Sequence, residues 1–75
     1  MNLELFKTFY FAAQYGSISK ASEKLYITQP AVSRAIKQLE DNMECTLFIR
    51  TPKGVKLTQE GEILYKYIDQ AFSFI

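Results

Sequence analysis

The strongest constraint on this chain is the spacing of its apolar residues, which recur at three- and four-residue intervals over much of its length. That spacing is typical of amphipathic helices, and it is broken at Gly16, at Thr28-Gln29-Pro30 and at Thr51-Pro52-Lys53-Gly54. The whole chain has only 75 residues, so the segments between these breaks are short. Because a chain of this size can bury only one small core, the sequence predicts a single, mainly α domain.

The breaks predict an order of helix, helix, helix, hairpin, helix. Ser17 or Ser19, then Thr28 and Thr58, are suitable N-caps, and Gly16 suits a left-handed C-cap. The expected helices cover residues 3–15, about 18–25, about 28–42 and from 59 to the chain end, and the expected hairpin covers about 47–57.

Composition excludes several kinds of chemistry. The chain has no histidine and one cysteine, Cys45, which removes histidine-based triads and the usual four-ligand zinc sites. Glu40 and Asp41 are neighbours that diverge by about 100° on a helix, so they do not form a paired-carboxylate site. We therefore expect no enzyme activity, no metal and no cofactor.

The sequence also predicts where the protein works. No apolar run reaches the roughly 18 residues of a membrane span, and Met1-Asn2-Leu3-Glu4 lacks the basic start of a secretory signal. A single cysteine cannot form an intrachain disulfide, which suits a reducing compartment. We expect a cytoplasmic protein without membrane contact.

The third predicted helix has two chemically different faces. On a helical wheel its apolar residues form one side, and a basic, hydroxylic set forms the other. The apolar side consists of Val32, Ala35, Ile36, Leu39 and Met43, and the polar side of Pro30, Ser33, Arg34 and Lys37. Gln29 and Arg34 are residue types that read adenine and guanine edges in the major groove of DNA. An ordinary surface helix has a similar pattern, so this helix alone does not decide the function.

The neighbouring elements favour DNA binding. The short second helix, with the small residues Ala21 and Ser22 at its expected crossing, forms a helix-turn-helix with the third. Tyr26 stands where many such turns have glycine, a replacement that the turn tolerates if Tyr26 is not left-handed. Residues 20–56 hold seven basic and four acidic residues, a net charge of +3, and the basic residues of the hairpin are Arg50, Lys53 and Lys56. A basic hairpin beside a helix-turn-helix is typical of a wing that contacts DNA.

The stretch from Phe6 through "SISKASEKLYITQPAVSRAIKQLED" to "LFIRTPKGVKLTQEG" resembles the N-terminal winged helix-turn-helix of LysR-type transcriptional regulators. Its most specific parts are "TQPAVSRAIKQLE" at 28–40, "LF-x-R" at 47–50 and "LT-x-x-G" at 57–61. The resemblance implies sequence-specific DNA binding by a winged helix-turn-helix over residues 1–58, with a three-helix core and a two-stranded β wing. Residues 59–75 would begin a linker and dimerisation helix.

The resemblance also implies roles for individual residues. Those expected to face the major groove are Gln29, Pro30, Ser33 and Arg34. Those expected to approach phosphates are Thr28, Lys37 and Thr58, while Arg50 and the rest of the wing, including Lys53, would reach the backbone or the minor groove. Relatives carry a C-terminal domain for a small-molecule effector, which this chain does not contain.

Two positions depart from the family pattern. Met43-Glu44 replaces the usual Leu-Gly, and Glu60 replaces the usual alanine. Glu44 is therefore expected to form a left-handed cap at a cost of about 1 kcal/mol. Neither departure touches the predicted DNA face.

The last helix is expected to pair two copies of the chain. Leu64, Ile68, Ala71 and Ile75 are spaced 4, 3 and 4 residues apart, the heptad rhythm of paired helices. A homodimer would bind an inverted-repeat operator in double-stranded DNA. A single wide core-facing stripe is the alternative for these four residues.

Another class of function is compatible with the same frame. Aromatic residues make up 15% of the chain, which suits a winged-helix module that binds a partner protein. Salt dependence separates the two, because phosphate contacts weaken steeply with salt and apolar contacts do not.

Overall fold

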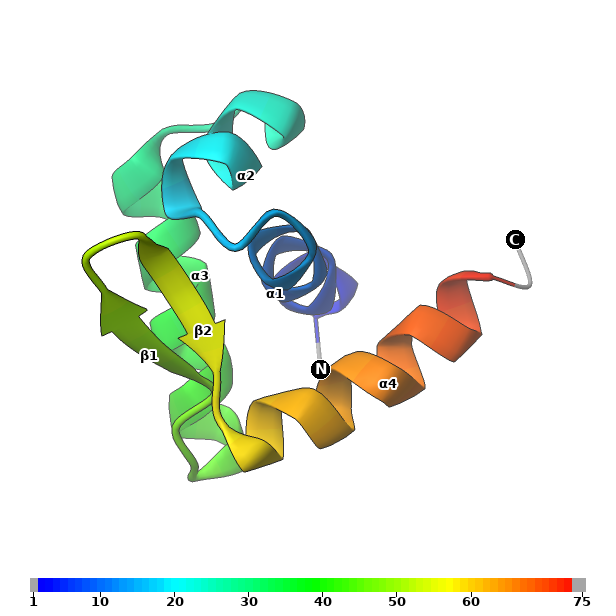
Figure 1. The fold of residues 1–75 in the computed structure, drawn as a ribbon. Helices are drawn as coiled ribbons and strands as arrows, with labels where there is room; N and C mark the ends of the chain where they lie inside the picture. The colour runs from blue at the N-terminus through cyan, green and yellow to red at the C-terminus, as the bar shows by residue number, and fades with distance from the viewer. Residues whose placement is uncertain (1, 74–75) are drawn as a thin grey trace.

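The computed structural model describes residues 2–73, and its elements follow the predicted order (Figure 1). The helices are α1 (Leu3–Tyr15), α2 (Ile18–Leu25), α3 (Gln29–Met43) and α4 (Gln59–Phe72), and the strands are β1 (Phe48–Thr51) and β2 (Gly54–Leu57). None of the helices in residues 2–73 combines the length and the hydropathy that a membrane span needs. The fold is mainly α with a two-stranded wing, as predicted.

Side-chain caps fix where all four helices begin, and Asn2 caps α1 by accepting the N–H of Glu4 at 2.9 Å. The Ser17 hydroxyl accepts the N–H of Lys20 at 3.1 Å, which selects Ser17 over Ser19 as the cap of α2. Thr28 caps α3 and Thr58 caps α4 in the same way, as expected, each accepting the N–H three residues further along. These bonds satisfy donors that have no partner inside the helix.

The turn between α2 and α3 does not meet the condition stated for Tyr26. Tyr26 has a φ of 58°, so it is left-handed, and the turn holds a residue other than glycine in that conformation. The reason is the tight end of α2: the N–H groups of Tyr26 and Ile27 donate back to the carbonyls of Glu23 and Ser22. That arrangement needs a left-handed residue at the end of the helix, here an aromatic one that is 94% exposed.

The end of α3 confirms the prediction for Glu44, which has a φ of 56°. Met43 is on the apolar side of α3 by its spacing, but it is 37% exposed and is not part of the core. It lies one turn beyond Leu39, the last buried residue of the helix, and borders a hollow beside α4. Helix periodicity continues to the end of the helix, but the packing against α1 does not.

Two clusters form the core. One joins α1, α3, α4 and the start of the hairpin, and the other holds the helix-turn-helix together. Their buried members are Leu5, Phe9, Leu39, Leu47 and Ile68 in the first, and Ala12, Ile18, Ala21, Val32 and Ile36 in the second. Ala21 and Ser22 are both buried, which confirms the small pair at the crossing of α2.

The hairpin is antiparallel, with Phe48 opposite Leu57 and Thr51 opposite Gly54, so only two residues connect the strands. It lies beside α3 (Figure 1). The N–H of Val55 donates to the carbonyl of Gly16 at 3.1 Å, which attaches β2 to the end of α1. The wing is therefore anchored to the helical part as well as paired with itself.

Helix α4 leads away from the base of the hairpin and crosses α1 (Figure 1). The Tyr10 hydroxyl donates to Asp69 at 2.7 Å, and its ring stacks on Tyr65 at 5.1 Å between centroids and meets Phe72 at 4.9 Å. The pKa of Tyr10 is raised well above its ordinary value, chiefly because the neutral hydroxyl donates to the Asp69 carboxylate. This polar and aromatic contact ties α4 to α1.

Candidate nucleic-acid interface

The N-terminal half of α3 presents its polar side to the surface. Thr28, Gln29, Pro30 and Arg34 are exposed and Ser33 is half-buried. The opposite side, formed by Val32, Ile36 and Leu39, is buried against the rest of the domain. The packing of the apolar side thus fixes which side chains of α3 can meet a ligand.

A hollow of about 380 Å³ separates α3 from the hairpin. It is lined by Ile18, Ser33, Ile36, Lys37, Glu40, Phe48, Arg50 and Val55. Its polar lining consists of two cationic side chains, one hydroxyl and the Glu40 carboxylate, which accepts two backbone N–H groups. The cations and the hydroxyl suit an anionic ligand like a backbone phosphate.

Arg50 points toward α3 and not toward the tip of the hairpin. Its Nη2 donates to the Oγ of Ser33 at 3.3 Å. This placement puts its guanidinium beside the polar side of α3, and the minor-groove contact that the resemblance implies for Arg50 stays a prediction. Lys53, in the exposed two-residue connection, is the basic side chain at the hairpin tip.

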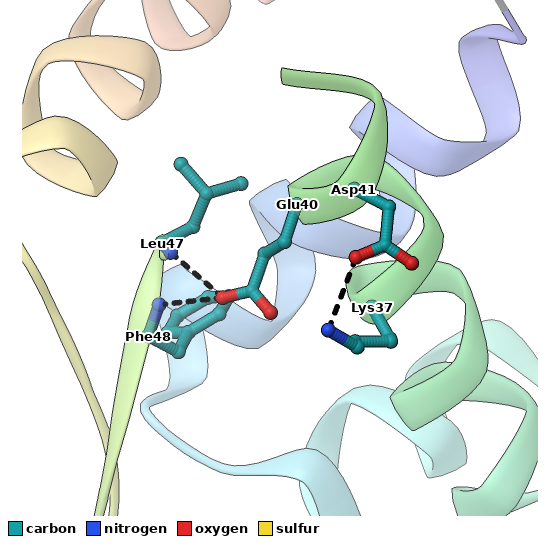
Figure 2. Close-up of polar contacts among 5 residues, drawn as sticks. All are labelled: Lys37, Glu40, Asp41, Leu47 and Phe48. Atoms are coloured by element: carbon teal, nitrogen blue, oxygen red, sulfur yellow. Dashed lines mark hydrogen bonds and ion pairs between the residues drawn. The ribbon is translucent and has the colours of Figure 1, made fainter. Parts of the chain in front are cut away.

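Glu40 joins α3 to the hairpin (Figure 2). Its Oε2 accepts the backbone N–H of Leu47 at 2.7 Å and that of Phe48 at 3.3 Å. The carboxylate thereby holds the start of β1 at a fixed place beside α3. Sequence reasoning missed this role, because no local pattern relates Glu40 to residues seven and eight positions away.

Lys37 and Asp41 form an ion pair one turn apart on the exposed side of α3 (Figure 2). The distance from Nζ to Oδ1 is 3.0 Å, and both side chains remain largely exposed. The hydrogen bond to Asp41 raises the pKa of Lys37. Lys37 stays a cation, and in the free domain its ammonium group is paired with the Asp41 carboxylate.

Thr58 is less available than the sequence implied. Its hydroxyl donates to the carbonyl of Thr46 at 2.6 Å and accepts the N–H of Gly61 at 3.0 Å. The single hydroxyl proton is therefore already used, and a phosphate would have to displace Thr46. The geometry gives Thr58 a structural role at the start of α4.

The four residues predicted for dimerisation do not share one environment. Ile68 is 8% exposed and belongs to the domain core, and Leu64 packs half-buried against that core. Ala71 is exposed, and Ile75 lies outside the described residues. Ile68 consequently has little surface to offer a partner, and the dimerisation role of the set stays a prediction.

The sequence matches a family model described as a bacterial regulatory helix-turn-helix protein of the lysR family, over residues 3–62. It is 41% identical over 73 residues to an uncharacterised HTH-type transcriptional regulator of Methanocaldococcus jannaschii, covering 97% of this chain and 25% of that protein. It is 43% identical over 67 residues to the nitrogen assimilation regulatory protein nac of Klebsiella aerogenes, covering 89% and 22%. The chain spans about a quarter of the length of these curated relatives.

Solved structures share the fold closely. The crystal structure of the BenM DBD in complex with catB site 1 DNA is 36% identical, has a TM-score of 0.91, and the match covers 97% of this chain and 82% of that one. CbnR, a LysR family transcriptional regulator, has the same fold at a TM-score of 0.91 and 24% identity, covering 99% of this chain and 26% of that one. With its helix-turn-helix, its wing and these matches, the chain belongs to the lysR family of regulatory helix-turn-helix proteins.

Proposed function

We propose that this domain binds double-stranded DNA at specific sequences, with α3 in the major groove and the hairpin on the backbone or in the minor groove. The observation that carries the proposal is the exposed polar side of α3, which places Gln29 and Arg34 outward. Within the described part of the chain, no side chain pairs with Arg34. An unoccupied guanidinium on an exposed helix can contact guanine through two parallel hydrogen bonds.

The surrounding residues supply contacts that do not depend on sequence. We propose that Thr28 and Lys37 on α3 contact DNA phosphates. Lys53 at the hairpin tip would contact the DNA backbone or the minor groove. Arg50 and Ser33 form a third group, placed where the backbone would pass between α3 and the wing. The BenM DBD at 36% identity was solved with DNA, which supports DNA binding by this fold.

Selection from a random pool of DNA duplexes tests the function directly. We expect this domain to enrich a short motif, repeated as an inverted pair, and to bind it less tightly as salt rises. Binding that ignores both sequence and salt, with retained affinity for a protein partner, would instead support the winged-helix interaction module.

We further propose that two copies pair through an exposed apolar face of α4, formed by Ile63, Tyr67 and Ala71 with Leu3 and Met43 at its edges. Ile63 is 54% and Tyr67 68% exposed, and apolar hollows on both sides of Tyr67 reach Met43 and Leu3. Contiguous apolar surface of this kind is typical of a protein contact. A second copy would place two copies of α3 on successive major grooves, as an inverted repeat requires.

Tyr67→Glu is expected to weaken self-association by at least about tenfold without unfolding the domain, because the side chain is largely exposed and aromatic anchors dominate such contacts. Sedimentation over a range of concentrations measures the effect, and Gln14→Glu on α1 adds the same charge as a control. Ile68→Glu is unsuitable as a test because it would place a carboxylate in the core. A parent that stays monomeric at millimolar concentration would refute the α4 contact.

The curated relatives are about four times as long as the segment that this chain matches. We propose that the domain acts in the cytoplasm on nucleoid DNA, as part of a regulator that a small-molecule effector reaches only through a C-terminal domain. Its relatives are transcriptional regulators, and we propose no catalytic role.

A further inference from the structure

On the basis of the proposed DNA binding, we propose that Asp41 is an internal competitor for phosphate that occupies Lys37 in the free domain and lowers affinity for every DNA sequence. Ser33, Lys37 and Asp41 follow one another at four-residue intervals, so they form one row along the side of α3. The row ends at the 3.0 Å ion pair between Lys37 and Asp41 (Figure 2). A carboxylate thus holds the ammonium group in the place where a backbone phosphate would be neutralised.

The neighbouring acidic side chain does not share this role. The Glu40 carboxylate accepts two backbone N–H groups at the start of β1, so it is half-buried and structurally used. Asp41 is 63% exposed in its side chain, and Lys37 72%. The ion pair is therefore accessible to solvent and can exchange Asp41 for another anion without unfolding α3.

The expected loss of DNA affinity can be estimated from the strength of an exposed ion pair on a helix. Exposed pairs one helical turn apart contribute only a few tenths of a kilocalorie per mole, so their rupture reduces DNA affinity by about twofold. Asp41 also stays near the phosphate that replaces it, and like charges repel. Together these effects should lower affinity by about two- to fivefold at low salt, and by less as salt screens the charges.

The effect of Asp41 on affinity should not alter which base sequence the domain prefers. Phosphate contacts position a protein on the duplex but carry no direct sequence information. Asp41 should therefore lower the affinity for specific and non-specific DNA by similar factors. Asp41 would adjust the affinity for DNA of any sequence, whereas Arg34 and Gln29 would determine which sequence is preferred.

The test compares Asp41→Asn with the parent on the selected site and on an unrelated duplex at two salt concentrations. We expect about two- to fivefold tighter binding to both duplexes at low salt. Glu62→Gln on α4, an exposed residue in the first turn, removes the same charge and is the control, with no comparable gain.

A double-mutant cycle with Lys37→Gln identifies the cause. If Asp41 acts by occupying Lys37, the gain from Asp41→Asn largely disappears in the Lys37→Gln background. An absent gain in the parent background, or one that persists without Lys37, would overturn the proposal while leaving DNA binding intact. Failure of the parent to bind any duplex would instead refute the proposed function.

Discussion

Replacing Arg34 with alanine should weaken binding to the preferred site by about 1 to 3 kcal/mol, roughly 5- to 160-fold, and should relax the preference at one base pair per half-site. The reason is that Arg34 is exposed on the polar side of α3 and can make a bidentate contact with guanine. Titration of the domain against a set of duplexes that differ by single base pairs measures both effects.

Lys37→Ala is the matched comparison, since it removes a cation one turn along the same helix. Its loss should be smaller and equal on every duplex, because a phosphate contact does not read bases and Asp41 already occupies the lysine. Identical losses for the two variants on all duplexes would show that α3 is not the recognition helix.

Gly61→Ala should destabilise the domain by about 1 to 3 kcal/mol, even though alanine is the better helix former by about 1 kcal/mol. A Cβ at Gly61 would collide with the carbonyl oxygen of Leu47 and touch the side chain of Leu57. The collision should outweigh the gain in helix propensity, because the Leu47 carbonyl also accepts the N–H of Thr58 and cannot easily move. Each kilocalorie corresponds to about 4 to 8 °C in Tm for a domain of this size.

Gly16→Ala provides the control, measured by urea unfolding beside Gly61→Ala. Gly16 has a φ of 63°, but a Cβ there would meet no atom nearer than 3.8 Å. Gly16→Ala should therefore lower the free energy of unfolding by only about 1 kcal/mol, the strain of alanine in a left-handed conformation. A Gly61→Ala variant as stable as the parent would refute this explanation. The glycine in "LT-x-x-G" would then not be required for the close approach of α4 to the hairpin.

The features that sequence predicted well are those decided by neighbours in the chain. A cap needs an oxygen and an N–H three residues apart, so Thr28 and Thr58 could be identified from the letters alone. The left-handed Glu44 was predictable only from the family resemblance, which places glycine at this position. The left-handed backbone of Tyr26 could not be predicted from its residue type, because it is imposed by the need to end α2 and begin α3 within three residues.

In the candidate site, too, contacts between near neighbours in the chain were predictable and contacts between distant segments were not. The pairing of Lys37 with Asp41 has a four-residue spacing that a helical wheel can reveal. The contact between Arg50 and Ser33 spans 17 residues and depends on how the hairpin packs against α3. No periodicity contains that information.

Helix α4 shows the limit of periodicity most clearly. A spacing of 4, 3 and 4 describes a stripe but does not state which neighbour covers it. In the structure the core covers Ile68, whereas Ile63 and Tyr67 remain exposed. The wide apolar arc was predictable, and its division between core and surface required the packing of α1.

The anchoring of the hairpin has a consequence for which DNA the domain can accept. Glu40 holds the start of β1, and the Gly16 carbonyl holds β2 through the N–H of Val55. With both strands attached, α3 and the wing keep a fixed mutual distance. A duplex whose groove widths do not match that distance must deform to touch both elements, and the cost of deformation depends on its sequence. We therefore expect base pairs that neither element touches to influence affinity through the shape and stiffness of the DNA.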